Sequence, residues 1–87
     1  MTRRRKLLLK AMNNPSGLRF EEFESLIESF GFLLDRQRGS HRLYVRDDVR
    51  EFVNVQPRAD GKAKAAQVRD FLILVQRYSL SLEGDEG

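Results

Sequence analysis

The segment RQRGSHRLYVR, residues 36–46, contains the only histidine of the chain, His41, and four arginines but no acidic residue. An imidazole gives or takes a proton near neutral pH, and arginine holds phosphate oxygens and stabilises charge that develops on them. RNA supplies its own nucleophile, the 2′-hydroxyl. This segment therefore has groups for metal-free RNA cleavage, although one imidazole cannot be base and acid at once, so a lysine, an arginine or water must supply the second proton transfer.

Two interpretations of His41 stay open at this point. A single histidine on an apolar strand face is commonly a partly buried packing residue. However, Gly39 and Ser40 directly before it predict a turn, which places His41 at the start of a strand rather than in its middle. The surrounding arginines would also repel a charged imidazolium, so stability alone does not explain why they cluster there.

A second candidate region is the segment DGKAKAAQV, which contains Lys62 and Lys64. These lysines stand at the predicted start of the last helix, where free backbone N–H groups and the helix dipole favour a phosphate. The alternative is that they only keep a loop soluble. Tyr44 and Phe52 are predicted to be exposed on the open face of the sheet, where they could stack on RNA bases or contact a protein partner.

The sequence lacks the residues that several other kinds of catalytic or binding site require. The chain has no cysteine, so a thiol nucleophile, a disulfide framework and a zinc knuckle are all excluded. The carboxylates show no metal-ligand spacing, and there is no glycine-rich phosphate loop. Ser40 and His41 are neighbours that point to opposite faces of a strand, which argues against a Ser-His-Asp triad. We therefore expect neither a metal nor another cofactor.

The elements that must position these residues follow from hydrophobic spacing. Apolar residues predict a short helix before the breaker NNPSG, a stronger helix from Phe20 to Phe30 capped by Gly31, and a last helix that begins near Lys64. Between the helices, alternating runs at 32–38, 41–46 and 51–56 predict three strands. The order predicts an α+β fold, (α)-α-β-β-β-α, with the helices packed on one face of a three-stranded antiparallel sheet.

The length and the charge distribution of the chain indicate its size class and the kind of partner it could bind. With 87 residues and a net charge of +3, the chain fits one small domain. Residues 1–19 hold six basic side chains and no acid, whereas residues 20–35 hold five acids and no base. Such blocks favour a polyanion partner, although an ordinary mixed-charge surface would also contain them. No apolar run suits a membrane span or a signal peptide, so we expect a cytoplasmic protein.

Four motifs occur in a familiar order: GF after an amphipathic helix, then RQRGSHRLY, VNVQP and GKAKAAQVRDFL. Between about Arg19 and Tyr78 the chain resembles the HicA-type toxins of bacterial toxin–antitoxin pairs. The resemblance implies a fold like a double-stranded-RNA-binding domain, metal-independent mRNA cleavage and neutralisation by a HicB-type antitoxin. The catalytic histidine of that family follows Gly-Ser, which implies that role for His41. Many members read Gly-Ser-His-His, and here Arg42 takes the place of the second histidine.

These observations predict a basic helical extension at 1–18, a HicA-like domain at 19–78 and an acidic flexible tail at 79–87. We expect an endoribonuclease with His41 as the catalytic residue, acting on mRNA with no membrane contact and no DNA binding by itself. The predicted RNA-binding residues are Arg36, Arg38, Ser40, Arg42, Lys62 and Lys64. Two other classes remain open: a non-catalytic module that binds double-stranded RNA, and a module that uses Tyr44 and Phe52 to bind a protein.

Overall fold

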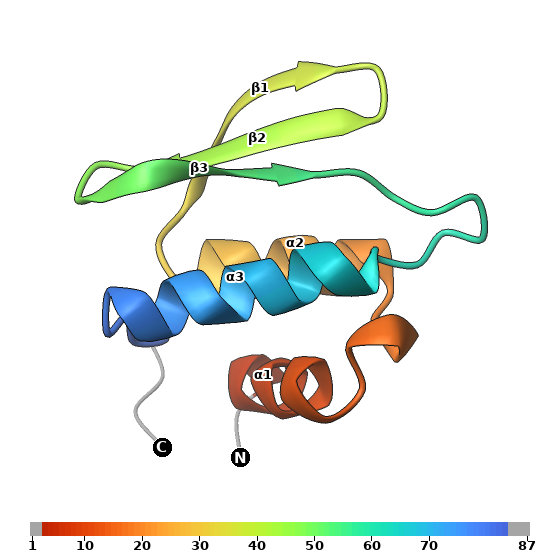
Figure 1. Cartoon of the computed structure of the whole chain (residues 1–87), viewed down its shortest axis with the longest axis horizontal. Coiled ribbons are helices and arrows are strands. Elements are labelled where there is room, and N and C mark those ends of the chain that lie inside the picture. The colour runs from red at the N-terminus through yellow and green to blue at the C-terminus, as the bar shows by residue number, and fades with distance from the viewer. Residues whose placement is uncertain (1–2, 84–87) are drawn as a thin grey trace.

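The computed structural model describes residues 3–83, and it contains three helices and three strands in the predicted order (Figure 1). The elements are α1 Arg3–Asn13, a 3₁₀ turn η1 Pro15–Gly17, α2 Phe20–Ser29, β1 Leu33–Arg38, β2 His41–Arg46, β3 Val49–Val55 and α3 Ala65–Arg77. The predicted α+β fold is confirmed. Part of the predicted acidic tail, residues 84–87, lies outside the described residues, as do residues 1–2.

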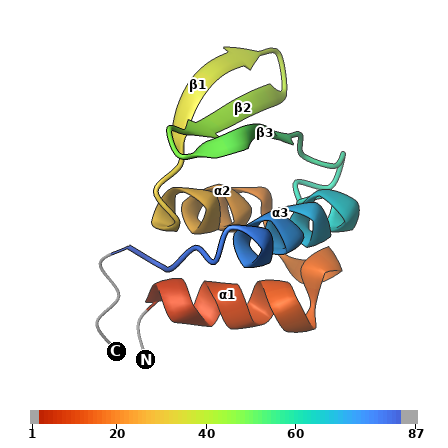
Figure 2. The same cartoon turned by 60° about the vertical axis from the view of Figure 1, so that its left-hand side comes forward.

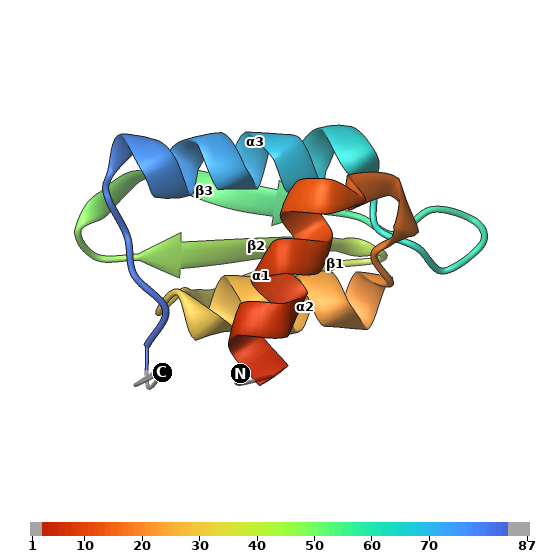
Figure 3. The same ribbon diagram turned by 90° about the horizontal axis from the view of Figure 1, so that it is seen from below.

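The elements form three layers (Figure 2). The antiparallel sheet has the strand order β1-β2-β3, and α2 and α3 pack side by side on one of its faces. The helix α1 lies beneath α2 and α3 and crosses them (Figure 3). The opposite face of the sheet is therefore uncovered within the described part of the chain, and that face is where the candidate site lies.

The helix α2 forms because its apolar residues recur on one face. Its five predicted core residues are all buried: Phe20, Phe23, Leu26, Ile27 and Phe30. Gly31, with φ of +88°, ends the helix and donates its N–H to the carbonyl of Glu28 at 3.0 Å. At the other end the Arg19 N–H donates to the Glu22 carboxylate at 2.9 Å. That is half of a capping box without the usual Ser or Thr, so the residues before Phe20 carry no conventional N-cap signal.

The core lies between the sheet and the helices and is centred on Phe71 of α3. Its ring packs edge-on against Phe23, Phe30 and Phe32 at centroid distances of 5.6–5.9 Å. Edge-to-face packing of this kind adds to the free energy gained by burying the rings. Because these rings come from α2, from α3 and from the segment entering β1, they fix the sheet relative to both helices.

One prediction about the faces of the sheet is wrong. Tyr44 was expected on the open face together with Phe52, but Tyr44 is 2% exposed, whereas Phe52 is 66% exposed. The cause is the register: Tyr44 pairs with Val53, so it points with the β3 valines toward the helices. Alternation within β2 separates its two faces, but only pairing with β3 decides which of them is covered.

Among residues 3–83, no helix is long and apolar enough to cross a membrane.

Candidate functional site

The turn between β1 and β2 sets the position of His41. Gly39 adopts φ of +60°, a conformation that side-chain-bearing residues rarely adopt, so the chain reverses there within two residues. His41 is the first residue of β2 and pairs with Arg38, the last residue of β1. His41 is exposed, so the alternative in which it is a packing residue does not hold.

His41 borders a shallow depression of about 240 Å³ on the uncovered face of the sheet. All three strands contribute to its lining, which consists of Arg36, Arg38, His41, Arg42, Leu43 and Asn54. The register brings them together, because Leu43 pairs with Arg36 on one side and with Asn54 on the other. Paired residues point to the same face, so two arginines from β1 stand beside the histidine of β2.

The two arginines of β1 leave their charge available to solvent. Arg36 is 73% exposed in its side chain and lies 3.5 Å from the carboxylate of its neighbour Asp35. Arg38 is exposed, and its side chain makes no hydrogen bond or ion pair with another described residue. An exposed guanidinium without a strong internal partner can bind a phosphate without first breaking a bond inside the protein.

Arg42 differs from both, because its guanidinium is bound on the helix side of the sheet. Its Nη1 lies 2.5 Å from both carboxylate oxygens of Glu24 on α2, and it also lies over the ring of Phe20 at 5.3 Å. The hydrogen bond to Glu24 raises the pKa of Arg42 above its ordinary value. The Tyr44 hydroxyl donates to the same carboxylate at 2.7 Å. The pKa of Tyr44 is raised, mainly because the hydroxyl is buried and also because it donates this hydrogen bond.

The lysines before α3 lie in different surroundings. Lys64 is the N-cap of α3, and its Nζ donates to the side-chain oxygen of Gln56 at 3.1 Å. The amide nitrogen of Gln56 lies 3.4 Å from the Ser40 hydroxyl, in the turn before His41. Gln56 therefore links Lys64 to the rim of the depression. Lys62 is exposed in the preceding loop, and the structure does not link its side chain to the other candidates.

Three residues at or near the site were missed as site residues by the sequence analysis. Asn54 completes the depression, Gln56 bridges Ser40 to Lys64, and Glu24 holds Arg42. Because side chains alternate along β3, Asn54 points to the face opposite to that of Val53, and this alternation can be read from the sequence. Its position beside Leu43 requires the register. Nothing in the sequence pairs Glu24 with Arg42, which are 18 residues apart.

Within residues 3–83, no group of three or more His, Asp or Glu side chains could hold a metal ion. An exposed histidine lies beside two exposed arginines on the open face of this small α-α-β-β-β-α domain, and together they form a basic site. A comparison with protein-family models gave a match over residues 20–75 to the family described as the HicA toxin of bacterial toxin–antitoxin pairs. The match covers more than half of the chain, so this protein belongs to the HicA toxin family and is a toxin of a toxin–antitoxin system. Membership of the family implies an antitoxin partner. Searches of curated proteins and of solved structures found no match.

Proposed function

We propose that this toxin is a metal-independent endoribonuclease that cleaves mRNA, with His41 as its catalytic residue. The observation that carries the proposal is the depression in which His41 stands beside Arg36 and Arg38, exposed and on one face. RNA approaching the uncovered face of the sheet would meet an imidazole and two guanidinium groups together. The match to a toxin family supports the same activity.

The reaction needs one nucleophile, one base, one acid and positive charge. The 2′-oxygen of the RNA attacks the adjacent phosphorus while its proton passes to a base, and the bond from phosphorus to the 5′-oxygen breaks as that oxygen gains a proton. The products are a 2′,3′-cyclic phosphate and a 5′-hydroxyl. His41 makes one of the two proton transfers, and Arg36 and Arg38 hold the non-bridging oxygens, where charge builds up.

The other proton transfer is assigned to water. Arg42 was one candidate for it, but its guanidinium is engaged by Glu24 on the helix side of the sheet. A guanidinium also gives up a proton too reluctantly to be a good acid near neutral pH. Because the depression is shallow and open, solvent reaches the place where the leaving oxygen would lie.

The remaining basic residues would guide the RNA. Lys62 is exposed, and Lys64, tied to Gln56, stands close to the turn that holds Ser40 and His41. Together they extend the positive surface from the depression to the start of α3, where phosphates are favoured. We further propose that the antitoxin is of the HicB type. It would bind to the face of the sheet that no described helix covers, where the exposed Phe52 offers an apolar contact.

The test is cleavage of a labelled single-stranded RNA by purified toxin in excess EDTA, comparing the wild type with His41→Ala. We expect cutting with the chelator present and a loss of about 10²–10⁴-fold in rate for the variant. His41 is exposed, so the thermal midpoint of the variant should match the wild type. Undiminished cutting by His41→Ala would exclude the assignment. RNA binding by both proteins without any cutting would instead favour a non-catalytic RNA-binding module.

A further inference from the structure

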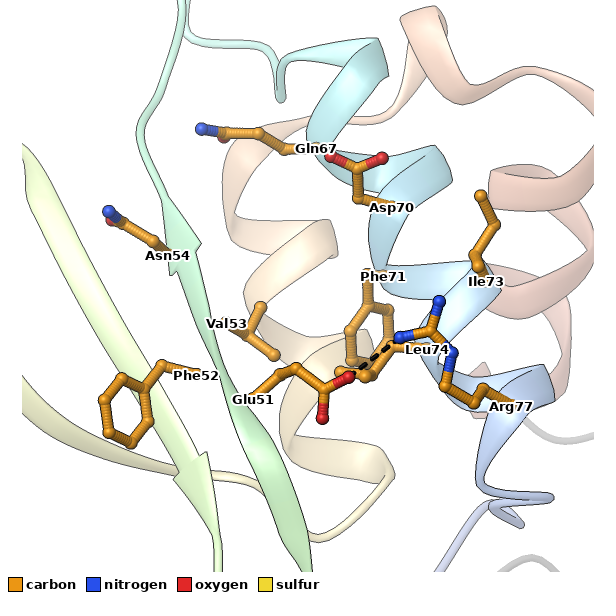
Figure 4. Close-up of a pocket in the computed structure, with 10 residues that line it drawn as sticks. All are labelled: Glu51, Phe52, Val53, Asn54, Gln67, Asp70, Phe71, Ile73, Leu74 and Arg77. Atoms are coloured by element: carbon orange, nitrogen blue, oxygen red, sulfur yellow. Dashed lines mark hydrogen bonds and ion pairs between the residues drawn. The ribbon is translucent and has the colours of Figure 1, made fainter.

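A second hollow lies between β3 and α3 (Figure 4). It has a volume of about 470 Å³, and its floor is apolar: Val53 from the strand, Phe71 and Leu74 from the helix. Ile73 stands beside this floor and is 53% exposed. Asn54 borders both this groove and the depression, but His41, Arg36 and Arg38 line only the depression.

The strand side of the groove is a free edge of the sheet. β3 is the last strand in the order β1-β2-β3, so half of its backbone N–H and C=O groups have no partner strand. Two side chains accept backbone N–H groups near the ends of this edge. Gln67 of α3 accepts the N–H of Gln56 at 3.1 Å, and the hydroxyl of Tyr78, directly after α3, accepts the N–H of Arg50 at 3.4 Å. Between these ends about five residues, or roughly 17 Å of strand, remain open.

The backbone of Asn54 belongs to this open stretch. N–H groups alternate between the two edges of a strand, so Asn54 directs its N–H and C=O to the same edge as Gln56, away from β2. An extended segment laid beside β3 would pair with these groups as a fourth strand. Its alternate side chains would point down onto Leu74 and Ile73 of α3. This combination of backbone pairing and side-chain pockets is how strands are added to sheet edges in other complexes.

The charge of the groove excludes a nucleic acid as its occupant. Arg77 reaches across from α3 and pairs with Glu51 at 2.8 Å (Figure 4), so its charge is already balanced. The carboxylate of Asp70 lines the groove and makes no hydrogen bond or ion pair with another described residue. The groove therefore carries an excess negative charge, which repels phosphate and favours a basic side chain on the partner.

Geometry also excludes a second copy of the chain that pairs through β3. Figure 3 shows α3 running alongside β3 and beyond its free edge. Two β3 strands paired about a two-fold axis would lie about 4.7–4.9 Å apart, whereas two packed helices need about 8–10 Å between their axes. The two α3 helices would collide. A single strand supplied by another protein has no such helix and fits above α3.

We propose that the β3–α3 groove is an anchoring site for an extended segment of the antitoxin, which adds to β3 as a fourth strand. The segment presents an apolar side chain to the floor of the groove and a basic side chain to Asp70. Phe52 borders both the groove and the uncovered face of the sheet, so one partner could reach both. The identity of the partner rests on the proposed function. In this arrangement the antitoxin is anchored in the β3–α3 groove, whereas a different part of it blocks His41.

The test uses Ile73→Glu, which places a second carboxylate beside Asp70, and Gln76→Glu as the matched control. Gln76 is an exposed residue of the same helix outside the groove, so both variants add one negative charge to α3. Affinity for a purified HicB-type antitoxin is measured by calorimetry in the full-length His41→Ala chain. We expect Ile73→Glu to weaken binding at least 10-fold and Gln76→Glu to leave it unchanged.

Two further measurements make the outcome specific. Amide hydrogen exchange at Asn54 should slow when the antitoxin binds, because strand addition protects that N–H. With His41 intact, the free Ile73→Glu toxin should cut RNA at the wild-type rate. Full affinity of Ile73→Glu, or unprotected exchange at Asn54, would overturn the proposal. Loss of RNA binding by Ile73→Glu would overturn the proposal in favour of RNA as the occupant of the groove. A dimer of the free chain that Ile73→Glu abolishes would overturn it in favour of a second copy. Failure of RNA cleavage by the wild type would affect only the proposed activity.

Discussion

Two clusters of the same composition join the sheet to a helix, and they differ mainly in burial. Between β2 and α2, the Glu24 carboxylate is bound by Arg42 and by the hydroxyl of Tyr44. Between β3 and α3, a second carboxylate, that of Glu51, is bound by Arg77 at 2.8 Å and by the hydroxyl of Tyr78 at 2.5 Å. We call these the inner and the outer cluster.

The side chains of the inner cluster are less exposed to solvent than those of the outer cluster. The Glu24 side chain is 14% exposed and that of Arg42 is 33% exposed, whereas Glu51 and Arg77 are 40% and 61% exposed. In the inner cluster, removing one group leaves others poorly hydrated and unpaired, which is costly. In the outer cluster, water replaces whichever group is lost, so little changes. Losing the same kind of contact is therefore expected to lower the free energy of unfolding more in the inner cluster than in the outer one.

The largest effect should follow Glu24→Ala. This change removes the only acceptor given by the structure for both the Arg42 guanidinium and the Tyr44 hydroxyl, so we expect a loss of about 2–3 kcal/mol in the free energy of unfolding. Urea denaturation followed by circular dichroism measures it. Glu51→Ala is the matched control in the outer cluster and should leave the urea midpoint nearly unchanged. Equal losses in the two variants would contradict the comparison.

A smaller effect should follow Arg42→His, which restores the Gly-Ser-His-His pattern of related toxins. The new imidazole would point toward α2 rather than into the depression, so the rate of RNA cleavage should not rise. The shorter side chain loses the paired contact with Glu24, and we expect a loss of about 2 kcal/mol, between the values for surface and buried pairs.

Cleavage assays and urea denaturation of Arg42→His measure both quantities. A gain of about 10-fold or more in cleavage rate would show that position 42 can reach the RNA, and the separation of the two faces of β2 would then be wrong.

The smallest effect is a change in titration at the outer cluster. The hydrogen bond from Tyr78 is the main cause that holds the pKa of Glu51 below its ordinary value of 4.5. A pKa lower in the folded than in the unfolded chain means that this group stabilises the fold above its unfolded pKa and loses that effect as the pH falls through its folded pKa. Tyr78→Phe should therefore move the pKa of Glu51 up toward 4.5.

A carboxyl titration by NMR, with Tyr44→Phe as the control that leaves Glu51 in place, measures this shift. An unchanged Glu51 titration in Tyr78→Phe would show that the hydrogen bond from Tyr78 is not the main cause of the lowered pKa.

Much of the architecture could be predicted from the sequence because it depends on local patterns. The 3.6-residue spacing of the apolar residues of α2 predicted its buried face, and Gly31 marked its end. Gly39-Ser40 predicted the turn that places His41 at the start of β2. Each of these depends on steric preferences or side-chain spacing within a few residues, which a single segment of sequence already contains.

What only the tertiary structure decided is which arginine is free. Arg42 directly follows His41 in the sequence and Arg38 stands three residues before it. Arg38 nevertheless lies beside His41 on the open face, whereas the chemically identical Arg42 is bound to Glu24 beneath the sheet. The pairing of β2 with β3 and the approach of α2 decide this, and the contact between Glu24 and Arg42 joins residues 18 positions apart. The sequence by itself determined that a histidine would stand at a strand start among basic residues. The register of the sheet determined which of those residues face outward with it, because a shift of one residue exchanges the two faces of a strand.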